Sequence, residues 1–359
     1  MNKIGTALLL TSILLSFIGI FVLFETSTYT SLLQIGDKYH FVKYQIGFVT
    51  AGIVIALFLS RIPFTLYKKY IVPIIVVSTI LLIAVLIPGL GLELKGARRW
   101  INFGIFVMQP SEVLKISLSM YLAAWLSVKE KARLFAFLLL VGLLTGLVML
   151  QPDLGTTMII AATSVVLYFL SGAPVRHIAA IFLIGIVGVF LLIKIEPYRA
   201  QRLMAFQNFN YENLNENDYH IKQILIALGS GGMTGVGIGK SIQKYAYLPE
   251  ATTDSIFAIY AEETGFVGGI FLVLLFVIFC ALGFMIAVRS IDPYARLLAA
   301  GIISFISFQA AINFSSQVVL LPLTGVPLPF ISYGGSSMLI NFAAVGILLN
   351  ISRSLHKKS

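Results

Sequence analysis

Two ionisable residues stand inside an apolar stretch that begins at Pro110. Glu112 and Lys115 are three residues apart, so on a helix they share one face and can pair. A charge inside a membrane span is a functional hypothesis by default, because its burial is costly. A purely structural ion pair explains the spacing equally well, and the spacing does not separate the two interpretations.

Two other polar groups flank apolar segments. Arg98 and Arg99 precede Trp100, a residue type common at membrane surfaces. Adjacent guanidinium groups offer forked donors for phosphate oxygens, although an interfacial anchor is the simpler interpretation. Asp153, in the motif QPDLGTT, stands where an apolar segment begins and is most simply a helix N-cap.

A glycine-rich run leads to a third carboxylate. The motif for a phosphate-binding P-loop is not met before Lys240, because Thr234 replaces its first glycine. We expect the glycines to let backbone N–H groups approach a ligand or the membrane, with Lys244 as another nearby cation. Asp254 follows at the border of the next apolar segment. Partial desolvation there would raise its basicity toward that of a general base, and a helix cap is an equally good interpretation.

Polar residues also interrupt the later apolar segments. Glu262 and Glu263 require either a polar cavity or a lysine partner. Gln309 and Asn313 are four residues apart, so they face one way and are typical of polar contacts between helices. Residues 321–335 contain three prolines and three glycines, and such backbone at membrane depth must be buried or line a cavity.

The composition shows what must position these residues. Of 359 residues, 58% are hydrophobic and 11% are charged, against about 25% charged in soluble domains. An ordinary soluble protein is therefore excluded. The net charge of +10 suits a basic membrane protein better than a nucleic-acid binder. One cysteine and four scattered histidines exclude a disulfide framework and a cysteine metal cluster.

Apolar segments long enough to cross a membrane recur along the whole chain. We predict an all-α, polytopic membrane protein forming a single domain over 1–359, with a large extracytoplasmic loop near 195–254 between the seventh and eighth spans. Within that loop, 221–228 is apolar enough for a short helix at the interface. The ten predicted spans are 7–24, 45–60, 71–88, 112–128, 134–150, 154–172, 177–194, 255–288, 297–318 and 333–351.

The distribution of basic residues predicts the orientation. With the N-terminus in the cytoplasm, the inner segments hold thirteen basic and two acidic residues, as the positive-inside rule requires. Ten spans return the C-terminus to the same side. The polar motifs described above then lie mostly at the outer face.

The motifs together resemble the signature blocks of the SEDS family (shape, elongation, division and sporulation proteins). The blocks are GARRWINFG with QPSEVLK, QPDLGTT, SIQKYAYLPEATTD with AEETGFVGG, and LPLTGVPLPFISYGGSS. The resemblance implies a ten-helix peptidoglycan glycosyltransferase of the bacterial inner membrane. Such proteins polymerise lipid II, a disaccharide-pentapeptide on undecaprenyl diphosphate, beside a class B penicillin-binding protein and other divisome or elongasome membrane proteins. No nucleic acid is implied.

The resemblance also implies roles for individual residues. Asp254 matches the family's essential aspartate and would deprotonate the GlcNAc 4-hydroxyl of the acceptor. Glu112 and Lys115 match positions linked to activity, and Asp153 matches the QPDLGT aspartate. A divalent cation, Mg²⁺ or Mn²⁺, is compatible with such a site, and no metal ligand is assigned. The residues expected to hold the diphosphate or otherwise contact substrate are Arg98, Arg99, Lys115, Asp153, Lys240, Gln243, Lys244, Glu250 and Ser336.

Two features refine the resemblance. The family usually has HTDF around its aspartate, whereas this chain has Thr252-Thr253-Asp254-Ser255. Residues such as SIQKYAYLPEA resemble the division (FtsW-like) branch more than the rod-shape (RodA-like) branch. Two other functions remain open, namely a lipid II flippase without chemistry and a scaffold for the penicillin-binding protein. A transporter would place essential charges near mid-bilayer, whereas these motifs gather at the outer face.

Overall fold

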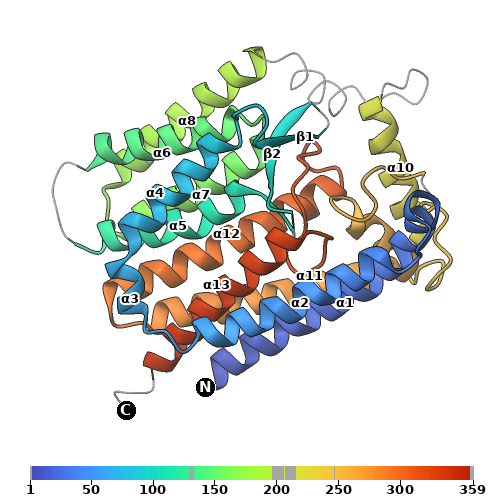
Figure 1. The fold of residues 1–359 in the computed structure, drawn as a ribbon, viewed down its shortest axis with the longest axis horizontal. Coiled ribbons are helices and arrows are strands. Elements are labelled where there is room, and N and C mark those ends of the chain that lie inside the picture. The colour runs from blue at the N-terminus through green and yellow to red at the C-terminus, as the bar shows by residue number, and fades with distance from the viewer. Residues whose placement is uncertain are drawn as a thin grey trace.

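The computed structural model describes residues 2–94, 96–104, 106–128, 133–195, 206, 216–245 and 247–355. Each of the ten predicted spans overlaps one helix, which confirms the all-α membrane class (Figure 1). Among the described residues, five of these helices are long and apolar enough to cross a membrane. The ten are α1 (Lys3–Ile35), α2 (His40–Leu59), α4 (Ile71–Ala84), α5 (Pro110–Leu126), α6 (Leu134–Met149), α7 (Leu154–Leu170), α8 (Val175–Ile195), α11 (Ile256–Arg289), α12 (Pro293–Gln317) and α13 (Gly335–Ser354).

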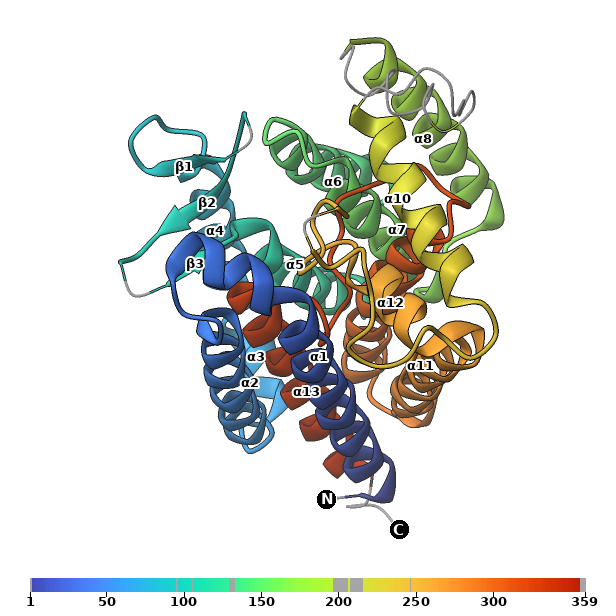
Figure 2. The same ribbon diagram turned by 90° about the vertical axis from the view of Figure 1, so that its right-hand side faces the viewer.

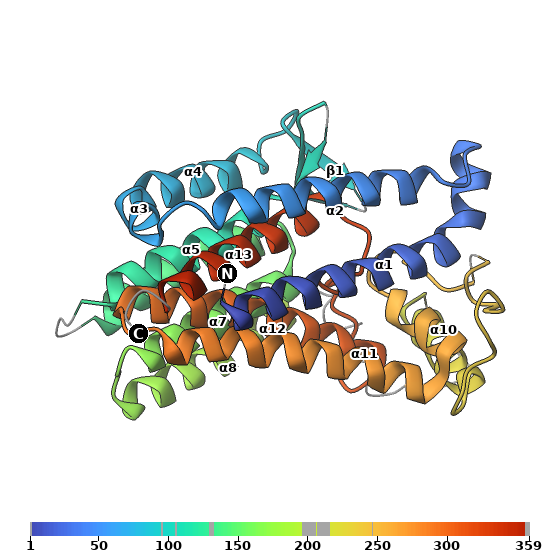
Figure 3. The ribbon, with the colours of Figure 1, turned by 90° about the horizontal axis from the view of Figure 1, so that it is seen from below.

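The two ends of the bundle differ. Both chain ends lie at one end, and α10 (Glu216–Gly231) lies at the other (Figures 1 and 3). Seen from the α10 end, the gold segment between α10 and α11 lies between a small β-sheet and α10 (Figure 2). Helix α10 contains the predicted interfacial helix 221–228, and much of the predicted loop before it lies outside the described residues. The same is true of the predicted inner-side charges Lys129, Glu130, Lys131, Lys357 and Lys358.

Helix α12 is the core of the bundle, packed against α5, α7, α11 and α13. Close approach between helices depends on small residues. A Cβ on Gly346 of α13 would lie 2.6 Å from the carbonyl oxygen of Ala56 on α2. Apolar side chains such as Phe135, Leu183 and Val288 are largely exposed on the outside, as expected for a surface that faces hydrocarbon.

Three features were not predicted. A three-stranded antiparallel sheet, β1 (Gly91–Leu94), β2 (Ala97–Asn102) and β3 (Val107–Met108), occupies the connection between α4 and α5. A short helix, α3 (Phe64–Lys69), precedes α4. Helix α11 is interrupted at Gly265, where φ is 71°. A Cβ there would lie 2.3 Å from the backbone nitrogen of Gly235, so only glycine fits this position.

Candidate functional site

The segment carrying Asp254 is held through its own backbone. The carbonyl of Glu250 accepts hydrogen bonds from the N–H groups of Thr253 (3.0 Å) and Ser255 (3.1 Å), which forms a tight turn just before α11. The N-cap of α11 is Ser255, one residue beyond Asp254.

Three consecutive carbonyls of this turn accept hydrogen bonds from other parts of the chain. The N–H of Tyr333 donates to Thr252 (2.9 Å), and the Ser332 hydroxyl donates to Thr253 (2.6 Å). The Asn313 amide donates to the carbonyl of Asp254 (2.9 Å). The backbone position of the half-buried Asp254 is thus fixed by α12 and by the loop before α13.

The carboxylate of Asp254 faces the proline- and glycine-rich loop. A Cβ on Gly325, whose φ is +72°, would lie 3.4 Å from the Asp254 Oδ2 atom. The same loop contacts α7, since a Cβ on Gly155 would lie 2.4 Å from the Val326 side chain and 3.2 Å from the carbonyl of Thr324. The loop therefore lies beside both Asp254 and the start of α7, and it brings the QPDLGTT motif and Asp254 to one place.

Asp153 is the N-cap of α7, as the simpler interpretation predicted. Its carboxylate accepts hydrogen bonds from the Thr156 N–H (2.9 Å) and hydroxyl (2.8 Å) and from the Gln109 amide (3.2 Å). Asp153 is 8% exposed. It ties the first turn of α7 to the residue before α5.

The neighbouring arginines point in different directions because alternate residues of a strand face opposite sides. Arg99 donates to the carbonyls of Gln151 (2.8 Å) and Pro152 (2.5 Å). Arg98 forms an exposed ion pair with Glu93 (2.9 Å) across the β1–β2 hairpin. The two guanidinium groups therefore do not form a joint fork.

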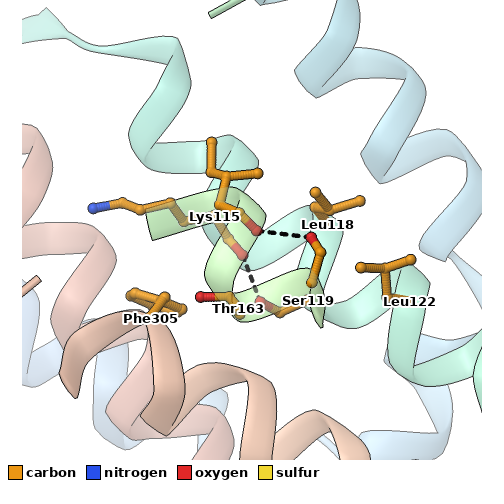
Figure 4. A pocket seen from close by; sticks show the side chains of 8 residues that line it. Lys115, Leu118, Ser119, Leu122, Thr163 and Phe305 are labelled. Atoms are coloured by element: carbon orange, nitrogen blue, oxygen red, sulfur yellow. Dashed lines mark hydrogen bonds between the residues drawn. The ribbon is translucent and has the colours of Figure 1, made fainter. Parts of the chain in front are cut away.

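Glu112 and Lys115 form a buried ion pair. The Lys115 Nζ lies 2.8 Å from Glu112 Oε1, and the two side chains are 1% and 4% exposed. The same Nζ donates to the side-chain oxygen of Gln309 on α12 (2.6 Å). Lys115 also borders a small cavity between α5, α7 and α12, and its amine points away from Leu118 and Leu122 on α5 (Figure 4).

Lys244, which was predicted to bind the diphosphate, forms a second buried ion-pair cluster within the protein. Its Nζ lies 2.9 Å from Glu25 of α1 and 3.1 Å from Glu263 of α11, and it donates to the carbonyl of Gly239 (2.8 Å). Burial alone would lower the pKa of Lys244, but hydrogen bonds and charge attraction from the two glutamates outweigh it and raise the pKa. The predicted lysine partner of Glu263 is thereby confirmed.

Part of the glycine-rich run is hydrogen-bonded to α11. The N–H groups of Val236 and Gly237 donate to the carbonyls of Glu262 (3.0 Å) and Glu263 (3.1 Å). These two N–H groups are therefore used in contacts within the protein. The Glu262 carboxylate accepts from the Ser241 hydroxyl, so this run is fastened to α11 at both backbone and side-chain level.

The other predicted residues are divided between surface and interior. Lys240 is exposed, whereas Gln243 and Ser336 are buried. Glu250 accepts from the Thr253 hydroxyl (2.9 Å). Within the described ranges, no group of three or more His, Cys, Asp or Glu side chains could hold a metal ion, so we derive no step through a metal.

Two residues that were predicted only as polar contacts between helices prove to contact the candidate site. Gln309 and Asn313 do bridge elements, as predicted, and their partners prove to be Lys115 and Asp254. Ser332 and Tyr333 had no signal beyond lying in a proline- and glycine-rich motif. The positive φ of Gly325 could have been suspected from the same motif.

Comparison with known proteins identifies the family of this chain. A family model described as "Cell cycle protein", covering FtsW, RodA and SpoVE, matches residues 6–357. The chain belongs to this family. It is 38% identical to stage V sporulation protein E of Bacillus subtilis, over 96% of each chain. It is 37% identical to a probable peptidoglycan glycosyltransferase FtsW of Trichlorobacter lovleyi, over 97% of this chain and 93% of that protein.

Solved structures share the fold. The rod shape determining protein RodA of Thermus thermophilus superposes with a TM-score of 0.71 at 26% identity, over 98% of this chain and 97% of that one. A chain from a structure on the coordination of polymerization and crosslinking by a peptidoglycan synthase complex gives a TM-score of 0.77 at 25% identity, over 98% of both chains. The predicted SEDS membership is confirmed.

Proposed function

We propose that this protein is a peptidoglycan glycosyltransferase that polymerises lipid II into glycan strands. The observation that carries the proposal is the Asp254 turn, whose backbone is fixed by α12 and the loop before α13 while its carboxylate faces Gly325. A general base requires this kind of fixed position next to its proton donor. The names of the relatives support the same reaction.

The resemblance to the family implies the course of the proposed reaction, with Asp254 as the base. Its carboxylate takes the proton of the acceptor's GlcNAc 4-hydroxyl, and the resulting oxygen attacks the anomeric carbon of the donor. The bond from that carbon to the diphosphate oxygen breaks, and undecaprenyl diphosphate leaves with the electron pair. Basic side chains stabilise the charge of this leaving group.

The structure favours some of the predicted cations over others for the diphosphate. Lys240 is exposed, and Arg98 has only an exposed ion pair, which is worth at most about 1 kcal/mol and is easily exchanged. Arg99, Lys115 and Lys244 already bind carbonyl or carboxylate groups. We therefore assign the diphosphate to Arg98 and Lys240, and structural support of the site to the other three.

We further propose the orientation predicted by the basic residues. Both termini lie in the cytoplasm, and the end carrying α10, the sheet and Asp254 faces outward from the bacterial inner membrane. A class B penicillin-binding protein, which would cross-link the strands, is the proposed partner, together with other divisome membrane proteins. The names of relatives with 34–38% identity, sporulation protein E and FtsW, support a septal rather than a rod-elongation role.

Reconstitution tests the reaction. The purified protein and its penicillin-binding partner are supplied with labelled lipid II, and glycan chains are resolved on a gel. We expect chains that lengthen with time. Transfer of lipid II across vesicle membranes without any chain formation would contradict the proposal and identify a flippase. Failure of the purified pair to form chains unless a separate glycosyltransferase is added would also contradict the proposal and identify a scaffold.

A further inference from the structure

Two amides on one face of α12 join the separate parts of the site. Gln309 and Asn313 are four residues apart and both are fully buried. Gln309 accepts from Lys115 Nζ (2.6 Å) and donates to the carbonyl of Pro327 (2.9 Å). Asn313 donates to the carbonyls of Val326 (2.8 Å) and Asp254 (2.9 Å).

The amide orientations follow from the partners. Both partners of the Asn313 nitrogen are carbonyl oxygens, which only accept, so the NH₂ group must face them. The Gln309 oxygen faces an ammonium group, which only donates, and its nitrogen faces a carbonyl. Each amide therefore has one orientation that satisfies its neighbours, and each bridges two chain segments that are otherwise separate.

The bridges set the position of the Asp254 carboxylate against its loop. Asn313 holds the backbone carbonyls of Asp254 and Val326 on the same nitrogen, and a Cβ on Gly325, the residue before Val326, would lie 3.4 Å from the Asp254 Oδ2 atom. Gln309 fixes the next residue of the loop, Pro327, to the buried Glu112–Lys115 pair. A displacement of either bridge would therefore move the loop relative to Asp254.

We propose that Gln309 and Asn313 are positioning residues for the transfer reaction, which couple the buried Glu112–Lys115 pair to the placement of Asp254. This inference rests on the proposed function. It gives Glu112 and Lys115 a role without substrate contact, since both are buried and reach the site through Gln309. A displacement of about 1 Å at a reacting group can cost about a hundredfold in rate.

The test compares Asn313→Leu and Gln309→Met, which keep size and remove the amide, with wild type. Polymerisation of labelled lipid II is measured per folded molecule, giving kcat, KM and the pH–rate profile. We expect kcat to fall about 10- to 100-fold with KM changed less than about threefold. We also expect the acidic limb of the Asn313→Leu profile to move, because the surroundings of Asp254 change.

Ser304→Ala provides the matched control, because Ser304 is a buried polar residue of the same helix without a contact to the loop or Asp254 among the described hydrogen bonds. We expect wild-type kcat for it. If Asn313→Leu does not fold, Asn313→Ser, which leaves space for water, is held to the same criteria.

The outcomes separate the two proposals. Wild type that makes no glycan contradicts the proposed function itself. Active wild type, together with amide variants that keep wild-type kcat and pH profile per folded molecule, overturns the positioning role. Loss of total activity that follows only the loss of folded protein also overturns it.

Discussion

Removal of the Lys115 charge tests how strongly the buried Glu112–Lys115 ion pair stabilises the folded protein. At 2.8 Å and an effective dielectric constant near 20, the attraction of the pair is about 6 kcal/mol. Lys115→Met leaves Glu112 as an uncompensated charge that is 4% exposed. Removal of one partner from a buried pair costs about 3–5 kcal/mol, so we expect a loss of that size in the free energy of unfolding.

The double variant Glu112→Gln/Lys115→Met removes both charges together. Because no isolated charge remains, we expect it to be at least about 1 kcal/mol more stable than Lys115→Met, within the coupling energies seen for contacting residues. Glu112→Gln alone should cost less than Lys115→Met, because Lys115 keeps its hydrogen bond to Gln309.

The assay is reversible unfolding in mixed detergent, followed by tryptophan fluorescence. Asp37→Asn is the matched control, because its ion pair with Lys43 is exposed, with side chains 40% and 64% accessible, and should change stability by less than about 1 kcal/mol. The reasoning is refuted if Lys115→Met is as stable as this control, or if the double variant loses the sum of the two single losses.

Three further predictions concern the loop, the second ion-pair cluster and the helix contacts. Gly325→Ala introduces a Cβ at positive φ beside Asp254 and should slow polymerisation at least about tenfold, a barrier increase near 1.4 kcal/mol; an unchanged initial rate would count against the assigned geometry. Lys244→Met leaves Glu25 and Glu263 unpaired and should lower the thermal midpoint. The pKa of Lys244 in the folded protein is raised above 10.5. The stabilisation from its ion pairs is therefore complete below pH 10.5 and is lost only as the pH rises through the higher pKa of the folded protein. The difference in thermal midpoint between Lys244→Met and wild type should therefore be equal at pH 6 and pH 9, and a difference that vanishes by pH 9 would refute the pairing. Gly346→Val should cost about 1–3 kcal/mol by overpacking against α2, whereas Gly142→Ala, which has open space around it, should be tolerated in the same unfolding assay; equal losses would contradict the packing argument.

The helices were predictable from sequence because hydrocarbon imposes a minimum apolar length on every span. Helix α1 is longer than its predicted span, since Thr26, Ser27 and Ser31 are buried in the bundle although they are polar. The sheet between α4 and α5 was not predictable, because its strands are only two to six residues long and lie among charged residues.

The residue types of the site were predictable from the sequence, whereas their hydrogen-bond and ion-pair partners were not. The motifs converge on one end of the bundle, but the sequence alone did not separate Lys240, which is exposed, from Lys244, which is buried between two glutamates. That difference depends on α1, more than two hundred residues away along the chain. The contacts of Gln309 and Asn313 are likewise long-range, so spacing could indicate bridging amides but not their partners.

The most direct test of the central claim is the initial rate of lipid II polymerisation by Asp254→Asn, at lipid II occupancy matched to wild type. A general base contributes about 10²- to 10⁴-fold, so we predict a loss of at least a hundredfold with lipid II binding retained. Asp37→Asn, the same substitution at an exposed carboxylate, should keep the wild-type rate. A rate for Asp254→Asn within threefold of wild type would contradict the assignment of Asp254 as the base.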